Sequence, residues 1–331
     1  MVLDSMLGDG PASNTHVDAI SSLGPNASPF LSPAGACGLL VLYTLVYILP
    51  LYGSPETRPS PTLSRDDPRV IRARVKSALI SAASCSICTY FILSNSHDTP
   101  FHAMGYWPLG LREAAGSLLL TVILFAAPLY ETLWLDGLWA DWVTMRPLHH
   151  VWATWTGWRN IVMGPLTEEL LFRSASVPLF LLARLSLSKI VFLTPIVFGL
   201  AHIHHFYEFR ITHPGVPLAD SIARSLLQFS YTSLFGAYAT FLFLRTRSLL
   251  AVILVHALCN SIGLPRFWGS VQPYWVTGRG PLSPVSARKW TVLYYVLLVG
   301  GAWGWWASLM PLTTSPMSTM EAVAWPATSQ G

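Results

Sequence analysis

The chain has 331 residues, of which 52% are hydrophobic and 11% are charged, and its mean hydropathy is +0.47. These charged residues are too few to form the polar surface of a soluble domain of this size. The composition therefore excludes a soluble globular protein and predicts an all-α, polytopic membrane protein. The net charge of +4 does not indicate nucleic-acid binding, because the basic residues lie in loops beside apolar runs, where membrane orientation and anionic lipid headgroups account for them.

The chain divides into a polar start, a long apolar region and a short polar end. Residues 1–33 are rich in Ser, Pro, Gly, Asn and Asp and have no basic segment before an apolar core, which predicts a disordered tail without a cleavable signal peptide. Residues 34–310 are expected to form the transmembrane domain, with its polar motifs at about 158–265, and residues 311–331 a flexible tail.

About eight apolar runs approach the ~20 residues that cross a bilayer. These runs are 35–52, 76–94, 115–135, 158–185, 189–205, 221–244, 248–265 and 290–309. In the fourth run, Pro178 and a group of charged residues leave open whether one helix crosses the membrane or two shorter helices meet inside it.

The distribution of Lys and Arg between the runs predicts the orientation of the chain. With the N-terminal tail in the lumen, the arginine-rich loop 53–75 and the loop 266–289 lie in the cytosol. The residues after 310, which include no Lys or Arg, then lie in the lumen. Arg245 and Arg247 would also face the lumen, and they oppose this orientation.

The segment Thr167–Arg173 places two carboxylates and a guanidinium within an apolar run. Ionisable side chains are costly inside a membrane and indicate function. On a helix Glu168 and Glu169 point about 100° apart, whereas Glu169 and Arg173 are four residues apart and share a face. Glu169 can therefore pair with Arg173 while Glu168 stays free to act, although the three side chains could instead form a buried ionic cluster that only holds helices together.

Two later runs contribute histidines. His202 lies near the end of 189–205, and His256 and Asn260 lie one turn apart on a single face of 248–265. A carboxylate beside an imidazole can deprotonate a water, and an amide NH2 and a second imidazole can donate hydrogen bonds to an oxyanion. These side chains predict a hydrolase that acts on a carbonyl group inside the membrane.

Other uses of the same side chains remain open. His202, His204, His205 and Glu208 could hold a metal ion, although the H-E-x-x-H pattern of zinc proteases is absent. The Glu/His cluster could also be a proton or ion relay in a non-catalytic transporter or scaffold, although the chain shows no inverted repeats. A serine nucleophile is not favoured, because the sequence has no G-x-S-x-G. We expect neither a bound metal nor a cofactor.

Three motifs stand in order on separate runs: Glu168-Glu169-x-x-x-Arg173, Phe198-x-x-x-His202 and His256-x-x-x-Asn260. Together they resemble the motifs of the CAAX protease and bacteriocin-processing superfamily. The residues around them are similar to its eukaryotic branch, the type II CAAX prenyl endopeptidases. The likeness lies in the second half of the chain, and the first half supports it only through its hydropathy.

The resemblance implies a glutamate-type intramembrane endopeptidase that removes the aaX tripeptide from prenylated C-a-a-X proteins such as small GTPases. It also implies the endoplasmic reticulum membrane, an active site accessible from the cytosolic side, and membrane lipid that receives the prenyl group. The implied roles follow from position in the motifs: Glu168 activates the water with His202 assisting, His256 and Asn260 form the oxyanion site, and Glu169 paired with Arg173 supports their geometry.

Overall fold

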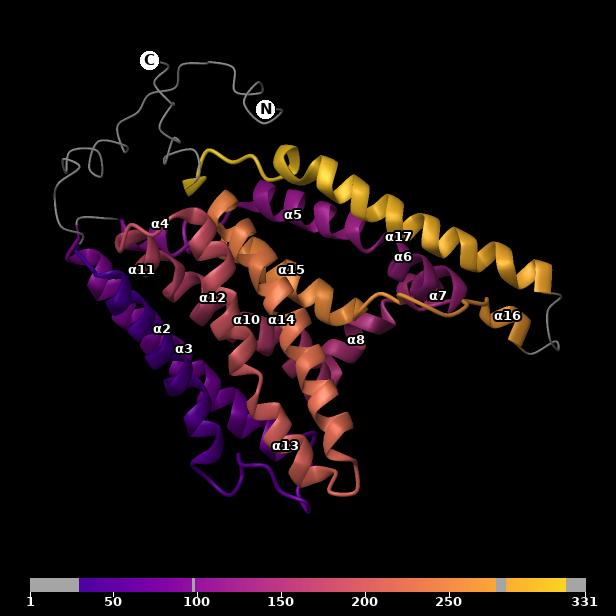
Figure 1. The fold of residues 1–331 in the computed structure, drawn as a ribbon, viewed down its shortest axis with the longest axis horizontal. Coiled ribbons are helices and arrows are strands. Elements are labelled where there is room, and N and C mark those ends of the chain that lie inside the picture. The colour runs from indigo at the N-terminus through magenta and orange to yellow at the C-terminus, as the bar shows by residue number, and fades with distance from the viewer. Residues whose placement is uncertain (1–29, 97–98, 278–283, 320–331) are drawn as a thin grey trace.

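The computed structural model describes residues 30–96, 99–277 and 284–319, and this part of the chain consists of helices and connecting loops (Figure 1). The predicted N-terminal tail falls almost wholly outside these residues, as does 320–331 of the predicted C-terminal tail. The longest helices are α2 (Pro33–Ile48), α3 (Pro68–Ser94), α5 (Leu111–Leu124), α12 (Leu187–Ala201), α14 (Leu218–Thr246), α15 (Leu249–Ile262) and α17 (Pro284–Leu312). The shorter elements are η1 (Leu49–Tyr52), α4 (Pro100–Ala103), α6 (Ala126–Leu129), η2 (Tyr130–Leu135), α7 (Trp139–Val143), α8 (Arg146–Ala153), α9 (Trp155–Gly157), η3 (Trp158–Met163), α10 (Gly164–Glu169), η4 (Leu170–Ala175), α11 (Val177–Leu182), α13 (His204–Thr212) and α16 (Tyr274–Thr277).

Several helices begin at side-chain caps. Ser32 accepts a hydrogen bond from the Gly35 amide at 3.0 Å at the start of α2, and Asp67 accepts one from the Arg69 amide at 2.8 Å at the start of α3. Each cap is followed by a proline, whose missing N–H is no loss in the first helical turn. Hydrogen bonds from the side chain and backbone of Arg69 also hold the pKa of the Asp67 carboxyl below its usual value.

The described residues include four helices that are long and apolar enough to cross a membrane: Pro33–Tyr52, Pro68–Ser94, Leu187–Thr212 and Arg288–Leu312. The pair Leu111–Leu124 and Ala126–Leu135 would make a fifth if its two helices, bent by 77°, form one span. The described part of the chain is all-helical, and the chain is a multi-pass membrane protein. The expected count of eight spans is not reached by length and apolarity alone.

The other three predicted runs are helical, but none of them has both the length and the apolarity of a membrane-spanning helix. Run 158–185 contains five charged side chains and is built from η3, α10, η4 and α11. Run 221–244 lies in α14, which is rich in polar side chains in its first half. Run 248–265 contains α15, whose 14 residues fall short of the ~20 that a span needs.

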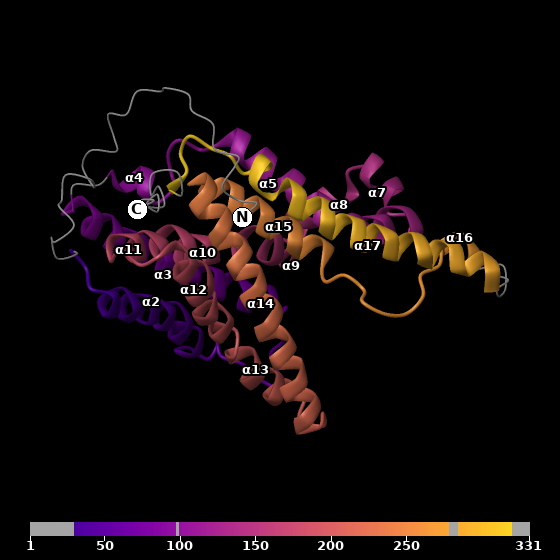
Figure 2. The same cartoon turned by 45° about the horizontal axis from the view of Figure 1, so that its top comes forward.

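The segment from η4 to α11 forms the centre of the bundle, and every residue from 171 to 180 is buried. Helices α2, α3, α12, α14 and α15 surround this central segment, while α17 runs alongside α5 and α6 away from it (Figure 1 and Figure 2). The charged motif therefore lies on the helix that is shielded most completely from lipid by the rest of the protein.

Helices α12 and α14 approach closely because each has a glycine at their contact. A Cβ atom added at Gly199 would fall against Ser233 Oγ and 3.0 Å from the Phe229 ring, and one added at Gly236 would lie 2.8 Å from Pro195 Cβ. Small residues at helix contacts are the usual means by which membrane helices pack closely.

Polar contacts join loops at two separate ends of the bundle. At one end, Arg65 and Arg74 bind Glu208, which joins the loop after α2 and the start of α3 to α13. At the other end, Arg247 bonds to His102 at 3.0 Å and Ser315 donates to Glu113 at 2.9 Å. The loops that connect successive helices therefore form two groups, one at each end of the bundle.

We expect Gly199→Ala to destabilise the detergent-purified protein by about 1–3 kcal/mol, the usual effect of overpacking, because the new methyl group must displace α14. The measurement is the free energy of unfolding in micelles. Gly38→Ala is the matched control, since a Cβ atom there meets nothing within 4 Å. Equal effects of the two substitutions would contradict the close packing of α12 on α14.

Candidate active site

The adjacent glutamates of α10 have different surroundings. Glu169 is fully buried, and its Oε1 atom lies 2.9 Å from Arg173 Nη1, which confirms the predicted pairing four residues apart. The Glu168 side chain is 22% exposed and faces two imidazole rings instead of a guanidinium. The helical offset between neighbours therefore separates a buried ion pair from a carboxylate that a ligand can reach.

Arg173 is held on several sides. Its Nη2 atom donates to the Gly236 carbonyl of α14 at 3.2 Å, and its Cζ atom lies 4.6 Å from the centroid of the Phe198 ring and 5.7 Å from that of Phe235. Aromatic faces attract a guanidinium, most strongly where water is excluded. The cation is thus fixed by α10, α12 and α14 together.

Glu168 lies between two histidines that come from different helices. Its Oε2 atom is 4.0 Å from His202 Nε2 and 3.9 Å from His256 Nε2. These distances are too long for direct hydrogen bonds and short enough for one water molecule to bridge. The structure therefore brings together three of the four predicted catalytic side chains.

The remaining ring nitrogens fix the orientation of both imidazoles. His202 Nδ1 donates to the Phe198 carbonyl at 2.8 Å, and His256 Nδ1 donates to Glu169 Oε1 at 2.7 Å. With Nδ1 protonated in each ring, Nε2 is the atom that points toward Glu168. Glu169 thus orients His256 as well as pairing with Arg173, a role that the spacing of the motifs did not indicate.

Asn260 is placed differently from the other predicted residues. It lies one turn after His256 and is exposed, and its side-chain NH2 donates to the backbone carbonyl of Asn160 at 3.0 Å. The structure records no hydrogen bond from the Asn260 side chain to the side chains of the other five candidate residues. The first turn of η3 is therefore linked to the last turn of α15 at the edge of the site.

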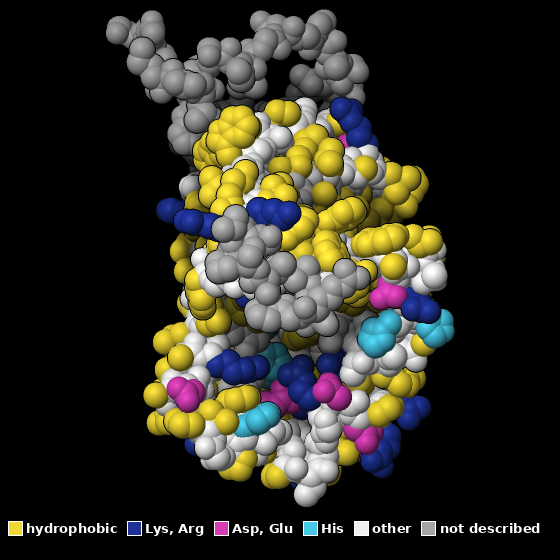
Figure 3. All heavy atoms as spheres, turned by 90° about the vertical axis from the view of Figure 1, so that its right-hand side faces the viewer, with side chains coloured by type: hydrophobic (Ala, Val, Ile, Leu, Met, Phe, Trp, Pro, Cys, Tyr) yellow, Lys and Arg dark blue, Asp and Glu magenta, His cyan; other side chains and the backbone are white. Residues whose placement is uncertain are grey.

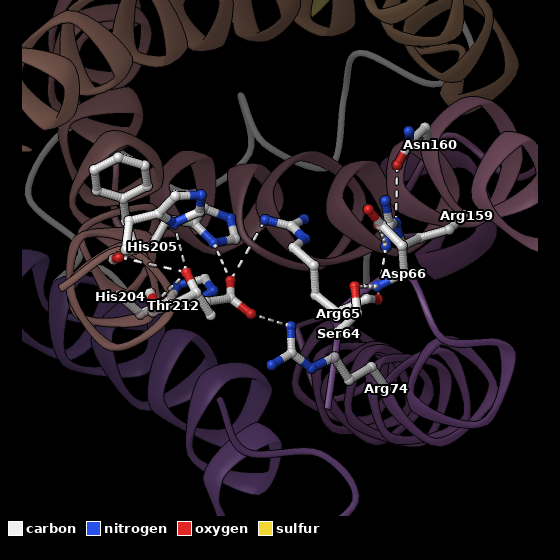
Figure 4. A network of polar contacts seen from close by, with 12 residues as sticks. Ser64, Arg65, Asp66, Arg74, Arg159, Asn160, His204, His205 and Thr212 are labelled. Carbon is white, nitrogen blue, oxygen red and sulfur yellow. Dashed lines mark hydrogen bonds and ion pairs between the residues drawn. The ribbon is translucent and has the colours of Figure 1, made fainter. Parts of the chain in front are cut away.

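The alternative metal ligands have other partners. His204 Nδ1 donates to the Ala201 carbonyl at 2.6 Å, and His205 Nδ1 lies 3.1 Å from Glu208 Oε2. Glu208 also binds Arg74 at 2.7 Å and Arg65 at 3.4 Å (Figure 4). No group of three or more His, Cys, Asp or Glu side chains within 30–96, 99–277 and 284–319 is arranged to hold a metal ion.

One further contact near the site could not be predicted. The Thr167 hydroxyl donates to the Met163 carbonyl at 2.8 Å and accepts a hydrogen bond from the Tyr47 hydroxyl at 2.8 Å. Tyr47 lies on α2, 120 residues away in the sequence, so no local pattern marks it. This bond ties α2 to the turn that precedes Glu168.

Figure 3 shows one face of the molecule. Hydrophobic side chains dominate the upper part of the face, whereas charged and histidine side chains gather around a recess in its lower part. A carboxylate and two oriented imidazoles within a multi-pass helical bundle define a membrane hydrolase as the class of protein.

Comparisons with known proteins agree with this class. Residues 150–262, which include all six candidate residues, match the family model described as type II CAAX prenyl endopeptidase Rce1-like. Among curated proteins, the probable CAAX prenyl protease 2 of Schizosaccharomyces pombe is 38% identical over 259 residues, which cover 78% of this chain and 87% of the relative. The CAAX prenyl protease 2 of Homo sapiens is 36% identical over 257 residues, covering 73% of this chain and 76% of the relative. The chain belongs to the type II CAAX prenyl endopeptidase family, whose members are proteases. No solved structure matches this chain significantly.

We expect Glu169→Ala to lower the free energy of unfolding by about 3–5 kcal/mol, because it leaves the Arg173 guanidinium buried without its carboxylate. Denaturant titration in micelles measures the change. The control is Arg146→Ala, which breaks an exposed pair with Asp141 and should alter stability by about 1 kcal/mol or less. A similar small change for Glu169→Ala would show that Arg173 does not depend on this partner.

Proposed function

We propose that this chain cleaves prenylated C-a-a-X proteins inside the membrane and releases their C-terminal aaX tripeptide, with Glu168 as the base that activates water. The convergence of Glu168 with two oriented imidazoles supports this assignment, since it supplies a proton acceptor and two neighbouring ring nitrogens at one point. The relatives are named as CAAX prenyl proteases, which supports the substrate class. Small GTPases with prenylated C-termini are the proposed substrates.

The reaction begins with a water between Glu168 and His202. Glu168 removes a proton while the water oxygen attacks the carbonyl carbon of the prenylated cysteine, and the lone pair on His202 Nε2 accepts the second hydrogen bond of that water. A tetrahedral intermediate forms, and its oxygen becomes negatively charged. The protonated Glu168 then delivers its proton to the departing nitrogen as the C–N bond breaks, which releases the tripeptide and restores the carboxylate.

His256 and Asn260 are assigned to the oxyanion. His256 donates from Nε2 when its ring carries both protons, and Glu169 accepts from its Nδ1 and compensates the added charge. Asn260 turns its NH2 from the Asn160 carbonyl to the oxyanion when substrate is bound. Glu169 and Arg173 act as positioning residues, because they hold His256 and the central helix instead of touching the substrate.

We also propose eight spans, in the endoplasmic reticulum membrane, with the N-terminal tail in the lumen. In this arrangement the runs 158–185, 221–244 and 248–265 also cross the membrane, and the charged segment of the first is surrounded by other helices in place of lipid. The grouping of the loops at two ends of the bundle supports spans that alternate in direction. Arg65, Glu208 and Arg159 meet at the end assigned to the cytosol. Glu168 lies about ten residues, or ~15 Å along an α-helix, from that end.

This depth suits a lipidated substrate. A prenyl chain gains ~0.8 kcal/mol for each CH2 that it buries in the membrane, so the lipid enters from the bilayer while the short peptide enters from the aqueous side. The scissile bond next to the prenylated cysteine is then delivered to the depth at which Glu168 lies.

We expect Glu168→Gln to abolish cleavage of a fluorogenic farnesylated C-a-a-X peptide by the detergent-purified enzyme, because the amide cannot accept the proton of water. Glu56→Gln is the matched control, since Glu56 is exposed on the loop after η1, and it should cleave at the wild-type rate. Wild-type activity that survives a strong zinc chelator agrees with the glutamate mechanism. Loss on chelation with recovery on adding metal would replace it with a metal-dependent one.

We expect Asn260→Ala to reduce kcat by about 10²–10³, the usual effect of removing one oxyanion donor. Single-turnover kinetics with the same peptide separate this effect from binding. Because Asn260 also bonds to the Asn160 carbonyl, thermal unfolding of the variant is measured in parallel. A wild-type kcat would limit Asn260 to linking η3 with α15.

A further inference from the structure

A network of charged side chains lies at the cytosol-assigned end of the bundle, next to the catalytic cluster. We call it the rim network and define it by its ion pairs as Arg65, Asp66, Arg74, Arg159 and Glu208; Figure 4 labels the three arginines and Asp66. Arg74 binds Glu208 at 2.7 Å and Arg65 binds it at 3.4 Å, while Arg159 binds Asp66 at 2.9 Å and the Arg65 carbonyl at 3.0 Å. Three guanidinium groups therefore share two carboxylates, which leaves one positive charge in excess.

The excess charge is most accessible on Arg65. Its side chain is 41% exposed, against 16% for Arg74 and 19% for Arg159. Within the described part of the chain its guanidinium makes one hydrogen bond, and that bond is the longest of the network. A guanidinium has five N–H donors in a planar fork that fits a carboxylate, so Arg65 has donors available for an anionic ligand.

The other two arginines serve to hold Arg65 in place. Arg74 donates to the Thr57 carbonyl at 2.7 Å in addition to binding Glu208. Arg159 fixes the backbone of Arg65 and also donates to Asn160 Oδ1 at 2.9 Å. The loop that contains Arg65 is thereby attached to α3, α13 and η3.

The rim network reaches the catalytic cluster from two sides. On one side, Glu208 binds His205, whose ring centroid is 5.9 Å from that of His202. On the other side, the backbone carbonyl of Asn160, the residue after Arg159, accepts a hydrogen bond from the Asn260 side chain. Arg65 thus lies a few side chains away from Glu168, on the aqueous side of it.

We propose that Arg65 binds the free α-carboxylate of the C-a-a-X substrate, an inference that rests on the proposed function. The tripeptide to be released ends in a carboxylate, and three extended residues span about 10 Å. A cation held at a constant separation from the activated water would recognise the end of the chain and determine that the bond three residues from it is cut. Arg65 is then a specificity-determining residue and takes no part in the chemical step.

An anionic lipid headgroup is the competing ligand for an arginine at a membrane surface. The experiment therefore uses neutral detergent micelles without phospholipid and compares two farnesylated peptides of identical sequence, one ending in a carboxylate and the other in an amide. For the wild-type enzyme we expect kcat/KM to be about tenfold to a hundredfold higher for the acid, the usual strength of a hydrogen bond to a charged group, mainly through a lower KM.

Arg65→Gln should reduce kcat/KM for the acid to the value for the amide and leave the amide unchanged. Arg65→Lys should retain part of the preference, because it keeps the charge without the fork. The matched control is Arg69→Gln in the same region, since Arg69 is 71% exposed and pairs with the neighbouring Asp67, and it should keep the full preference.

Three outcomes would overturn the proposal while leaving the protease assignment intact. These are equal cleavage of acid and amide by the wild type, equal losses for both peptides in Arg65→Gln, and an effect of Arg65→Gln that appears only in vesicles containing phosphatidylserine. The last result would assign Arg65 to a lipid headgroup. Failure of the wild type to cleave either peptide would instead remove the proposed function, and this proposal with it.

Discussion

The structure depends on the buried carboxylate of Glu169. Its Oε1 atom accepts hydrogen bonds from Arg173 at 2.9 Å and from His256 at 2.7 Å, so one oxygen joins the central helix to α15. Arg173 in turn bonds to Gly236 of α14 and lies over Phe198 of α12. Removing charges from water is costly, and a buried ion pair contributes little net stability compared with apolar packing. The contribution of the Glu169 contacts here is geometric, because they fix the relative placement of the helices that contain the reactive side chains.

The two adjacent glutamates show how one helix supplies both support and reactivity. Side chains on successive residues point about 100° apart, so the same turn directs Glu169 into the bundle and Glu168 toward His202 and His256. Among the residues that the structure describes, no guanidinium lies within ion-pair distance of Glu168, and His202 and His256 border it at about equal distances. A carboxylate paired with arginine would be a weak proton acceptor. Keeping the arginine on Glu169 leaves Glu168 available as a base while the charge of the cluster stays compensated.

Local periodicity explains which features could be predicted from the sequence. The pairing of Glu169 with Arg173 depends only on helical spacing, and it is confirmed. The contact between His256 and Glu169, the bond from Tyr47 to Thr167 and the binding of Arg65 to Glu208 join residues 87, 120 and 143 positions apart, and no local pattern encodes them. The eight predicted spans remain a prediction, because length and apolarity identify four or five among the described residues. The central segment is buried by other helices and need not be apolar, and the first half of α14 is rich in polar side chains. Neither therefore meets the length and apolarity of a span, although both were predicted as helices.

The helix that contains Glu168 is irregular on both sides of α10. The π-helical turns η3 (Trp158–Met163) and η4 (Leu170–Ala175) flank it, and such turns are frequent at functional sites because each inserts a residue into the helical repeat. On the N-terminal side, η3 contains Arg159, which binds Asp66, and Asn160, whose carbonyl accepts a hydrogen bond from the Asn260 side chain. On the C-terminal side, η4 contains Arg173. One continuous helical segment thus contacts the rim network through η3, the two imidazoles through Glu168 and the buried ion pair through Glu169 and Arg173.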